Sequence, residues 1–134
     1  MAQILIIDDD TQLLQAMEIA FRKSRHNLKT ACDGKKGLAC MAQFPAIDVV
    51  ITDIIMPELD GIEVIATLNK QPCRPVIIAM SGGSQRLDLN LLLQTAKMMK
   101  VDLVLPKPIT PMELLEAIET LLLTRQTNCS MNLL

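Results

Sequence analysis

Four short polar segments of this 134-residue chain stand directly after apolar runs, and their side chains could act together. Three of them offer oxygen atoms, from the carboxylates of Asp8-Asp9-Asp10, the carboxylate of Asp53 and the hydroxyl group of Ser81. The fourth offers the ammonium group of Lys107, which stands between two prolines. Carboxylates gathered at one place repel one another unless a cation lies among them. If the segments meet, they predict a site for a hard divalent ion such as Mg²⁺, which prefers oxygen ligands.

Asp53 is the candidate nucleophile of such a site. It follows an apolar run, where a carboxylate is costly unless it is coordinated or reacting. With a metal at one oxygen and Lys107 as counter-charge, the other oxygen could attack a phosphoryl group in line. Ser81 offers a hydrogen-bond donor to a phosphoryl oxygen, and Gly82 after it lets the backbone approach. These residue types predict phosphoryl transfer to a carboxylate.

The four segments meet only if the chain forms a parallel sheet, because each follows a different apolar run. Runs of strand length alternate with stretches of helical period, which predicts successive βαβ units and the α/β class. The carboxyl ends of the strands then form one edge, where ligands bind. The predicted strands are 3–7, 28–32, 47–52, 75–80 and 101–105, and the predicted helices are 11–24, 35–43, 61–70, 84–98 and 111–123.

The composition of these runs and their flanking residues predict which strands are central and where the helices begin. Residues 4–7, 49–51 and 76–79 are apolar without alternation, as in central strands, whereas the more polar run 28–32 indicates an edge strand. Asp10 is a candidate helix cap, and Thr110-Pro111-Met112-Glu113 has the pattern of a capping box. We expect one domain over residues 1–123 and a loosely held C-terminal tail over residues 124–134.

The composition excludes several classes of protein. Half of the residues are hydrophobic and 21% are charged, so a folded domain with a proper core is expected. The formal net charge is -2 and the chain has two Phe and neither Trp nor Tyr, so direct nucleic-acid binding is not expected. The apolar run near the N-terminus has only four residues, which fits neither a signal peptide nor membrane insertion. We expect a cytoplasmic protein.

Cysteine and histidine supply no further site in this interpretation. The cysteines form no C-x-x-C pair and no metal-finger spacing, so we interpret them as small buried residues in a reducing compartment. They are Cys32, Cys40, Cys73 and Cys129. His26 stands alone between Arg25 and Asn27 and is interpreted as a surface residue.

The polar segments resemble those of the receiver domain of two-component response regulators. The resemblance covers about residues 3–123, with four motifs in the right order and spacing. They are Ile4-Leu5-Ile6-Ile7-Asp8-Asp9-Asp10, Asp53-Ile54-Ile55-Met56-Pro57-Glu58-Leu59-Asp60-Gly61, Ser81-Gly82 and Lys107-Pro108. The resemblance implies a flavodoxin-like, doubly wound (βα)5 domain with a five-stranded parallel sheet of order 2-1-3-4-5.

The resemblance also implies a role for each site residue. Asp53 would be the phosphoacceptor, charged by a histidine kinase or a histidine phosphotransfer protein. Asp9, Asp53 and the backbone carbonyl of Ile55 would bind Mg²⁺ directly, and Asp8 would act through water. Ser81 would move onto the phosphoryl group and Lys107 would pair with it. Such a domain is not a classical enzyme, although it catalyses its own Mg²⁺-dependent phosphorylation and dephosphorylation.

Two positions depart from the family pattern. Val104 replaces a frequent Tyr or Phe, which puts the aromatic half of the usual switch in question, and Ile109 replaces a common aromatic residue. A target that binds on phosphorylation is expected on the apolar surface between Leu87 and Leu123. A regulator that works by docking and a receiver cut from a longer protein both fit the chain.

Two other classes of protein compete with a phosphorylatable receiver. An aspartate-nucleophile phosphatase of the haloacid dehalogenase type would need a D-x-D-x-T/V pattern, which Asp8-Asp9-Asp10-Thr11-Gln12 fails at its last position. It would also need more chain for its acid and cap segments. A docking-only pseudo-receiver would normally have lost part of the acidic cluster, the acceptor or the lysine, and all of them are present.

Overall fold

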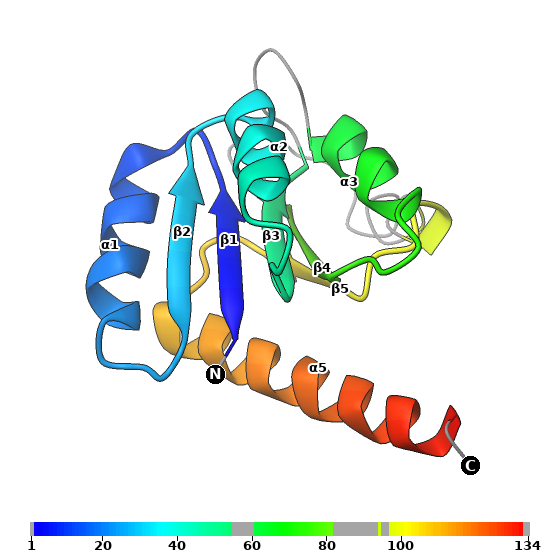
Figure 1. The fold of residues 1–134 in the computed structure, drawn as a ribbon. Helices are drawn as coiled ribbons and strands as arrows, with labels where there is room; N and C mark the ends of the chain where they lie inside the picture. The colour runs from blue at the N-terminus through cyan, green and yellow to red at the C-terminus, as the bar shows by residue number, and fades with distance from the viewer. Residues whose placement is uncertain (1, 55–60, 82–93, 95–96, 133–134) are drawn as a thin grey trace.

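Five parallel strands form one sheet in the computed structural model, which describes residues 2–54, 61–81, 94 and 97–132, with side chains as far as Arg125. The strands are β1 (Gln3–Ile7), β2 (Asn27–Ala31), β3 (Val49–Asp53), β4 (Val76–Ser81) and β5 (Leu103–Pro106). They lie in the order β2-β1-β3-β4-β5 (Figure 1). The predicted strand order is confirmed.

Helices cover both faces of the sheet. They are α1 (Thr11–Phe21), α2 (Gly34–Gln43), α3 (Gly61–Asn69) and α5 (Pro111–Asn132). Buried residues of α1 and α5 share one hydrophobic cluster with the sheet, and those of α2 and α3 share a second one (Figure 1). The fold is therefore doubly wound, as predicted. Most of the predicted helix 84–98 lies outside the described residues. Residues 94, 97 and 98 are the part of it that is described, and they are helical.

The three central strands are buried because their apolar side chains face a helix layer on each side. Every residue of β3 and β4 is buried, and so are residues 4–7 of β1, whereas most residues of β2 and β5 are partly exposed. The register places Asp53 beside Met80 and Ser81 beside Pro106. The carboxyl ends of the strands therefore lie along one edge of the sheet.

Capping residues fix where the flanking helices begin. The side chain of Asp10 accepts hydrogen bonds from the backbone N–H groups of Gln12 and Leu13, at 3.1 and 3.2 Å. Thr110 and Glu113 form the reciprocal capping box before α5, with distances of 3.1 and 3.2 Å. Both predicted caps are confirmed. Helix α1 ends earlier than predicted, because the N–H and hydroxyl groups of Ser24 both donate to the carbonyl of Phe21.

Helix α5 continues through Asn132, so residues 124–132, where a loosely held tail is expected, are helical; the segment contains neither Gly nor Pro to end the helix. Two smaller predictions need correction. His26 is not a surface residue, because only 10% of its side chain is exposed and its Nδ1 accepts a hydrogen bond from the Ala2 N–H at 3.1 Å. Cys73 is exposed rather than buried. Among the described helices, none is long and apolar enough to cross a membrane.

Candidate functional site

Lys107 joins two carboxylates at the carboxyl edge of the sheet. Its Nζ donates to Asp8 Oδ2 at 2.6 Å and to Asp53 Oδ2 at 2.9 Å. Asp8 directly follows β1, Asp53 ends β3, and Lys107 directly follows β5. The sheet therefore brings together three residues that come from three βα units.

Burial makes it costly for the carboxylates of this cluster to carry a negative charge. Asp8 is fully buried and Asp53 is 8% exposed. Burial raises the pKa of the Asp8 carboxyl group above its ordinary value, although hydrogen bonds from Lys107 and from the Asp10 N–H act in the opposite direction. Burial alone would lower the pKa of the Lys107 ammonium group, but its hydrogen bonds to Asp8 and Asp53 raise it above its ordinary value. Two carboxylates share one ammonium group, so the cluster favours an additional cation.

Asp9 completes a group of oxygen ligands at the surface of this cluster. One carboxylate oxygen from each of Asp8, Asp9 and Asp53 can be chosen so that all three lie within 4.8 Å of one another. Asp9 is exposed, whereas the other two are buried. Both oxygens of Asp8 already accept hydrogen bonds, from the Asp10 N–H at 2.9 Å and from Lys107. A set of carboxylate oxygens suits a hard divalent cation such as Mg²⁺.

Ser81 lies at the same edge and is tied to Lys107 through the backbone. The Lys107 N–H donates to the Ser81 carbonyl at 2.7 Å, and Ser81 is 5% exposed. This bond continues the pairing of β4 with β5, so the two side chains start from adjacent strand ends. Ile55 and Gly82, which were also expected in the site, lie outside the described residues.

Sequence reasoning did not assign a role to Gly61, which the structure places against Asp53. A Cβ atom at Gly61 would lie 1.9 Å from the Asp53 carbonyl oxygen and 2.8 Å from its carbonyl carbon. The Gly61 N–H also donates to the Ile54 carbonyl at 3.0 Å. The first residue of α3 therefore packs directly on the backbone that carries the candidate nucleophile, an approach that only glycine allows. The Asp60-Gly61 pair before a helical pattern was the available signal.

The bond between Lys107 and Asp8 was also missed, because Lys107 was expected to act only as counter-charge to Asp53.

Ile109 is 8% exposed and packs in the cluster beneath α1 and α5, so it fills the core as expected for an apolar residue at that position. Val104 is partly exposed and packs against the other cluster. The described residues thus place an aliphatic side chain on β5 where the family often has an aromatic one.

Comparison with known proteins decides the family. The family model of the response regulator receiver domain matches residues 4–119 of the chain. The chain belongs to the response regulator receiver family. This assignment makes it homologous to regulators of two-component signalling, consistent with a phosphoacceptor and with a signalling role rather than that of a classical enzyme. It favours the receiver over a phosphatase of the haloacid dehalogenase type.

Solved receiver structures have the same fold over almost the whole chain. A response regulator receiver domain protein from Clostridium thermocellum is 28% identical, with a TM-score of 0.81, and the match covers 95% of this chain and 98% of that one. The chemotaxis response regulator CheY4 of Vibrio cholerae is 27% identical, with a TM-score of 0.75, over 90% of this chain and 98% of that one.

Curated relatives match over only part of their own length. The transcriptional regulatory protein CpxR of Klebsiella pneumoniae is 31% identical over 122 residues, which are 91% of this chain and 50% of CpxR. The transcriptional regulatory protein GlrR of Escherichia coli is 36% identical over 84 residues, which are 62% of this chain and 19% of GlrR. The receiver thus spans half or less of the length of these two relatives.

Proposed function

We propose that Asp53 accepts a phosphoryl group from the phosphohistidine of a histidine kinase or a histidine phosphotransfer protein. An oxygen of Asp53 attacks the phosphorus atom, the bond between phosphorus and the histidine nitrogen breaks, and the nitrogen leaves with the electron pair. The observation that carries the proposal is the 2.9 Å bond from Lys107 Nζ to Asp53 Oδ2 at a nearly buried strand end. A docking-only domain has no need to hold a buried carboxylate in this way.

Lys107 and Ser81 are proposed to stabilise the phosphoryl group. Lys107 already contacts Asp53, so its ammonium group can follow the negative charge onto the phosphoryl oxygens as the new bond forms. The hydroxyl group of Ser81 would donate to another phosphoryl oxygen from the neighbouring strand end, and Gly82 would leave room for it. The reverse reaction, hydrolysis of the acyl phosphate, would use the same groups.

Mg²⁺ fits the donor set of this edge. Asp9 and Asp53 would hold it directly, together with the backbone carbonyl of Ile55, while Asp8 would act through water because both of its oxygens already accept hydrogen bonds. When bound, the ion would neutralise phosphoryl oxygens during transfer. Burial raises the pKa of Asp8, which means that the single charge of Lys107 does not fully offset the cost of the buried carboxylate. This supports a site for a further cation.

Phosphorylation is proposed to change the binding of a protein target in the cytoplasm. The expected surface runs from Leu87 to Leu123, and residues 87–93, 95 and 96 of it lie outside the described part of the chain. Within the described part, α5 and β5 border a groove of about 350 Å³. It is lined by Leu103, Glu113, Glu116, Ala117, Thr120 and Leu121. We assign residues 1–123 to the receiver domain and residues 124–134 to its C-terminal extension.

The proposal is tested with acetyl phosphate as donor. Intact-mass spectrometry after incubation with acetyl phosphate and Mg²⁺ should show one added phosphoryl group on the wild-type chain. Asp53→Asn should abolish the addition, because the amide keeps the shape of the carboxylate without its nucleophilic oxygen. Asp10→Asn is the matched control, since it removes one charge at the same edge and Asn still caps α1. Equal labelling of Asp53→Asn and wild type would assign the acceptor to another residue.

A further inference from the structure

Three cations gather at the C-terminal end of α1 without a partner in the described part of the chain. Arg22, Lys23 and Arg25 are exposed, and the structure gives none of their side chains an ion pair or hydrogen bond with a described residue. Arg22 and Arg25 border a hollow of about 490 Å³, which His26 also lines. Residues 22–25 hold three of the 13 Lys and Arg residues and none of the 15 acidic residues. This chain of net charge -2 therefore has a distinctly basic region.

An acidic surface lies directly beside these cations, on α5. Residues 108–124 contain three glutamates and no Lys or Arg. Glu113 is engaged in the capping box, whereas Glu116 and Glu119 are exposed on the helix. Glu119 Oε1 lies 3.5 Å from Nε2 of His26, the residue that follows Arg25. The basic and acidic surfaces therefore meet at the contact between Glu119 and His26.

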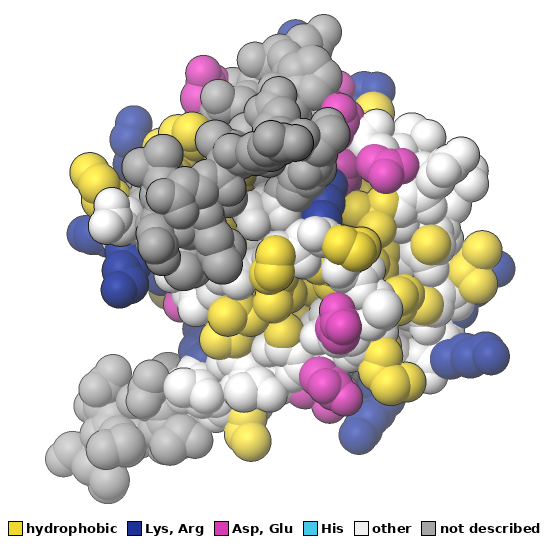
Figure 2. Space-filling model, turned by 180° about the vertical axis from the view of Figure 1, so that it is seen from behind, with side chains coloured by type: hydrophobic (Ala, Val, Ile, Leu, Met, Phe, Trp, Pro, Cys, Tyr) yellow, Lys and Arg dark blue, Asp and Glu magenta, His cyan; other side chains and the backbone are white. Residues whose placement is uncertain are grey.

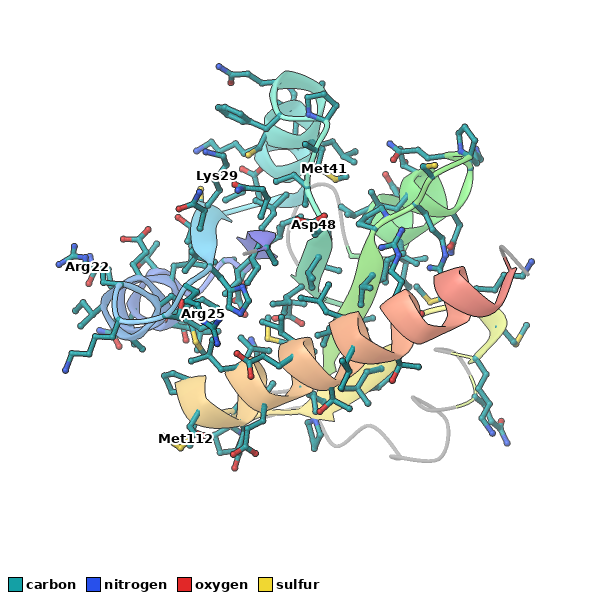
Figure 3. The ribbon with its side chains drawn as sticks, turned by 60° about the horizontal axis from the view of Figure 1, so that its bottom comes forward. Arg22, Arg25, Lys29, Met41, Asp48 and Met112 are labelled. Atoms are coloured by element: carbon teal, nitrogen blue, oxygen red, sulfur yellow. The ribbon has the colours of Figure 1, made fainter. Side chains whose placement is uncertain are left out.

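Exposed apolar side chains accompany the two charged surfaces. Ile19 on α1 is 61% exposed and Met112 on α5 is 70% exposed. The two helices belong to the same layer, because their buried residues share one hydrophobic cluster. Figure 2 shows acidic side chains over α5 and Lys or Arg side chains at the right-hand edge, where α1 lies. Figure 3 shows Arg22 and Arg25 extending from the α1 end and Met112 from the first turn of α5.

We infer that the outer face of α1 and α5 binds a second copy of this chain through these complementary charges. A two-fold axis near the boundary would place the cations of one protomer, Arg22 and Arg25, against the partner's glutamates, and the reverse pair would form at the same time. Each protomer carries both halves of the contact, so no foreign partner is needed. A nucleic acid fits this face less well, since its phosphates would meet Glu18 and Glu119 beside the cations.

The cations of this interface are distant from the phosphorylation chemistry. Arg22 and Arg25 follow α1 and precede β2, at the amino ends of the strands, whereas Asp53 and Lys107 lie at the carboxyl ends. Dimer formation through α1 and α5 therefore needs neither Mg²⁺ nor a phosphoryl group. It is an association of exposed charges, so it should be weak and salt-dependent.

Sedimentation equilibrium of the unphosphorylated full chain tests this inference, with interference optics because the chain lacks Trp and Tyr. At about 100 µM protein we expect a reversible dimer in about 0.05 M NaCl that dissociates in about 0.5 M NaCl. Two charge reversals, Arg22→Glu with Arg25→Glu and Glu116→Lys with Glu119→Lys, should each weaken self-association at least about tenfold. Mixing the two variants in equal amounts should restore a dimer, because both pairs are again complementary.

A matched double reversal keeps the test specific. Lys35→Glu with Lys70→Glu changes the same charge on α2 and at the end of α3, on the opposite face of the sheet, and should dimerise like wild type. Thermal unfolding would show that every variant folds. A wild-type monomer in low salt, a charge-reversed variant that dimerises like wild type, or a mixture that stays monomeric would each overturn the inference.

Discussion

The ammonium group of Lys107 lies 2.9 Å from a carboxylate oxygen of Asp53, although the two residues are 54 positions apart in the chain. The same nitrogen lies 2.6 Å from Asp8. One cation thus serves two nearly buried carboxylates, and the site retains an excess of negative charge. This arrangement holds the Asp53 carboxylate in place, and in the proposed function it leaves that carboxylate open to Mg²⁺ and a phosphoryl group.

Removing the charge of Lys107 should destabilise the fold in the absence of metal. Lys107→Met leaves Asp8 and Asp53 without their shared donor, so we expect the free energy of unfolding at neutral pH to fall by about 1–3 kcal/mol. Because the folded pKa of Lys107 is raised, this contribution is present below its unfolded value of about 10.4 and is lost as pH rises through the folded value. Urea unfolding in EDTA measures the loss. Lys107→Arg keeps the charge and should lose less; equal losses would show that charge is not what matters.

The pH dependence of stability should reveal the cost of burying Asp8. Its folded pKa is raised by burial, so its contribution to the free energy of unfolding is full below the unfolded value of about 3.9. The contribution is lost as pH rises through the folded pKa. Asp8→Asn has no proton to lose there, and its amide oxygen can still accept from the Asp10 N–H. In EDTA, Asp8→Asn should therefore gain stability relative to wild type as the pH rises above about 4.

Unfolding curves of both proteins across this range provide the test, with Mg²⁺ as the second arm. The ion binds the folded state only, so it should stabilise wild type more than Asp8→Asn and reduce the difference between them. A difference that stays constant with pH in EDTA would be incompatible with a raised pKa of Asp8.

Asp9 and Asp8 should differ in their importance for Mg²⁺. Asp9 is exposed and open to a ligand, whereas both oxygens of Asp8 accept hydrogen bonds. We expect Asp8→Ala to weaken Mg²⁺ binding by about tenfold, as for an outer-shell partner, and Asp9→Ala to weaken it by more than about 100-fold. Isothermal titration calorimetry suits a chain without tryptophan. Equal losses would mean that both carboxylates contact the ion directly.

Gly61→Ala should disturb the site as well as the fold. The new methyl group would meet the Asp53 carbonyl oxygen at 1.9 Å, so the backbone of the acceptor must shift, at a cost of about 1–3 kcal/mol. Mg²⁺ affinity and phosphorylation should both fall. Gly37→Ala is the matched control, because the three atoms nearest to its Cβ all belong to the Ile7 side chain, the first of them at 2.4 Å. It should lose stability and keep Mg²⁺ affinity; if both variants keep it, Gly61 has no positioning role.

Apolar runs made most of the fold predictable. The central strands lack alternation because helices cover both of their faces, and this pattern marks them clearly in residues 4–7 and 76–79. Strand ends were less certain, because side chains replace backbone partners there: Asp102 Oδ2 accepts from the Ile77 N–H, and β5 begins only at Leu103. The extension of α5 through Asn132 was not predicted, although the segment contains neither Gly nor Pro to interrupt a helix.

Contacts between distant segments could not be predicted from sequence spacing. The side chain of His26 is nearly buried because its Nδ1 is an acceptor for the Ala2 N–H, a contact across 24 positions that its polar neighbours did not suggest. The second bond of Lys107, to Asp8, spans 99 positions. The close approach of Gly61 to Asp53 depends on how α3 returns to the sheet. Such relationships arise only when the strand ends are assembled.

The most direct test of the central claim is to locate the phosphoryl group after reaction with acetyl phosphate and Mg²⁺. Borohydride reduction converts an aspartyl phosphate to homoserine, which tandem mass spectrometry of the peptides can place on a single residue. The account predicts homoserine at position 53 in the wild-type chain and none in Asp53→Asn. Homoserine at position 8 or 9, or a phosphate ester on Ser81, would contradict it.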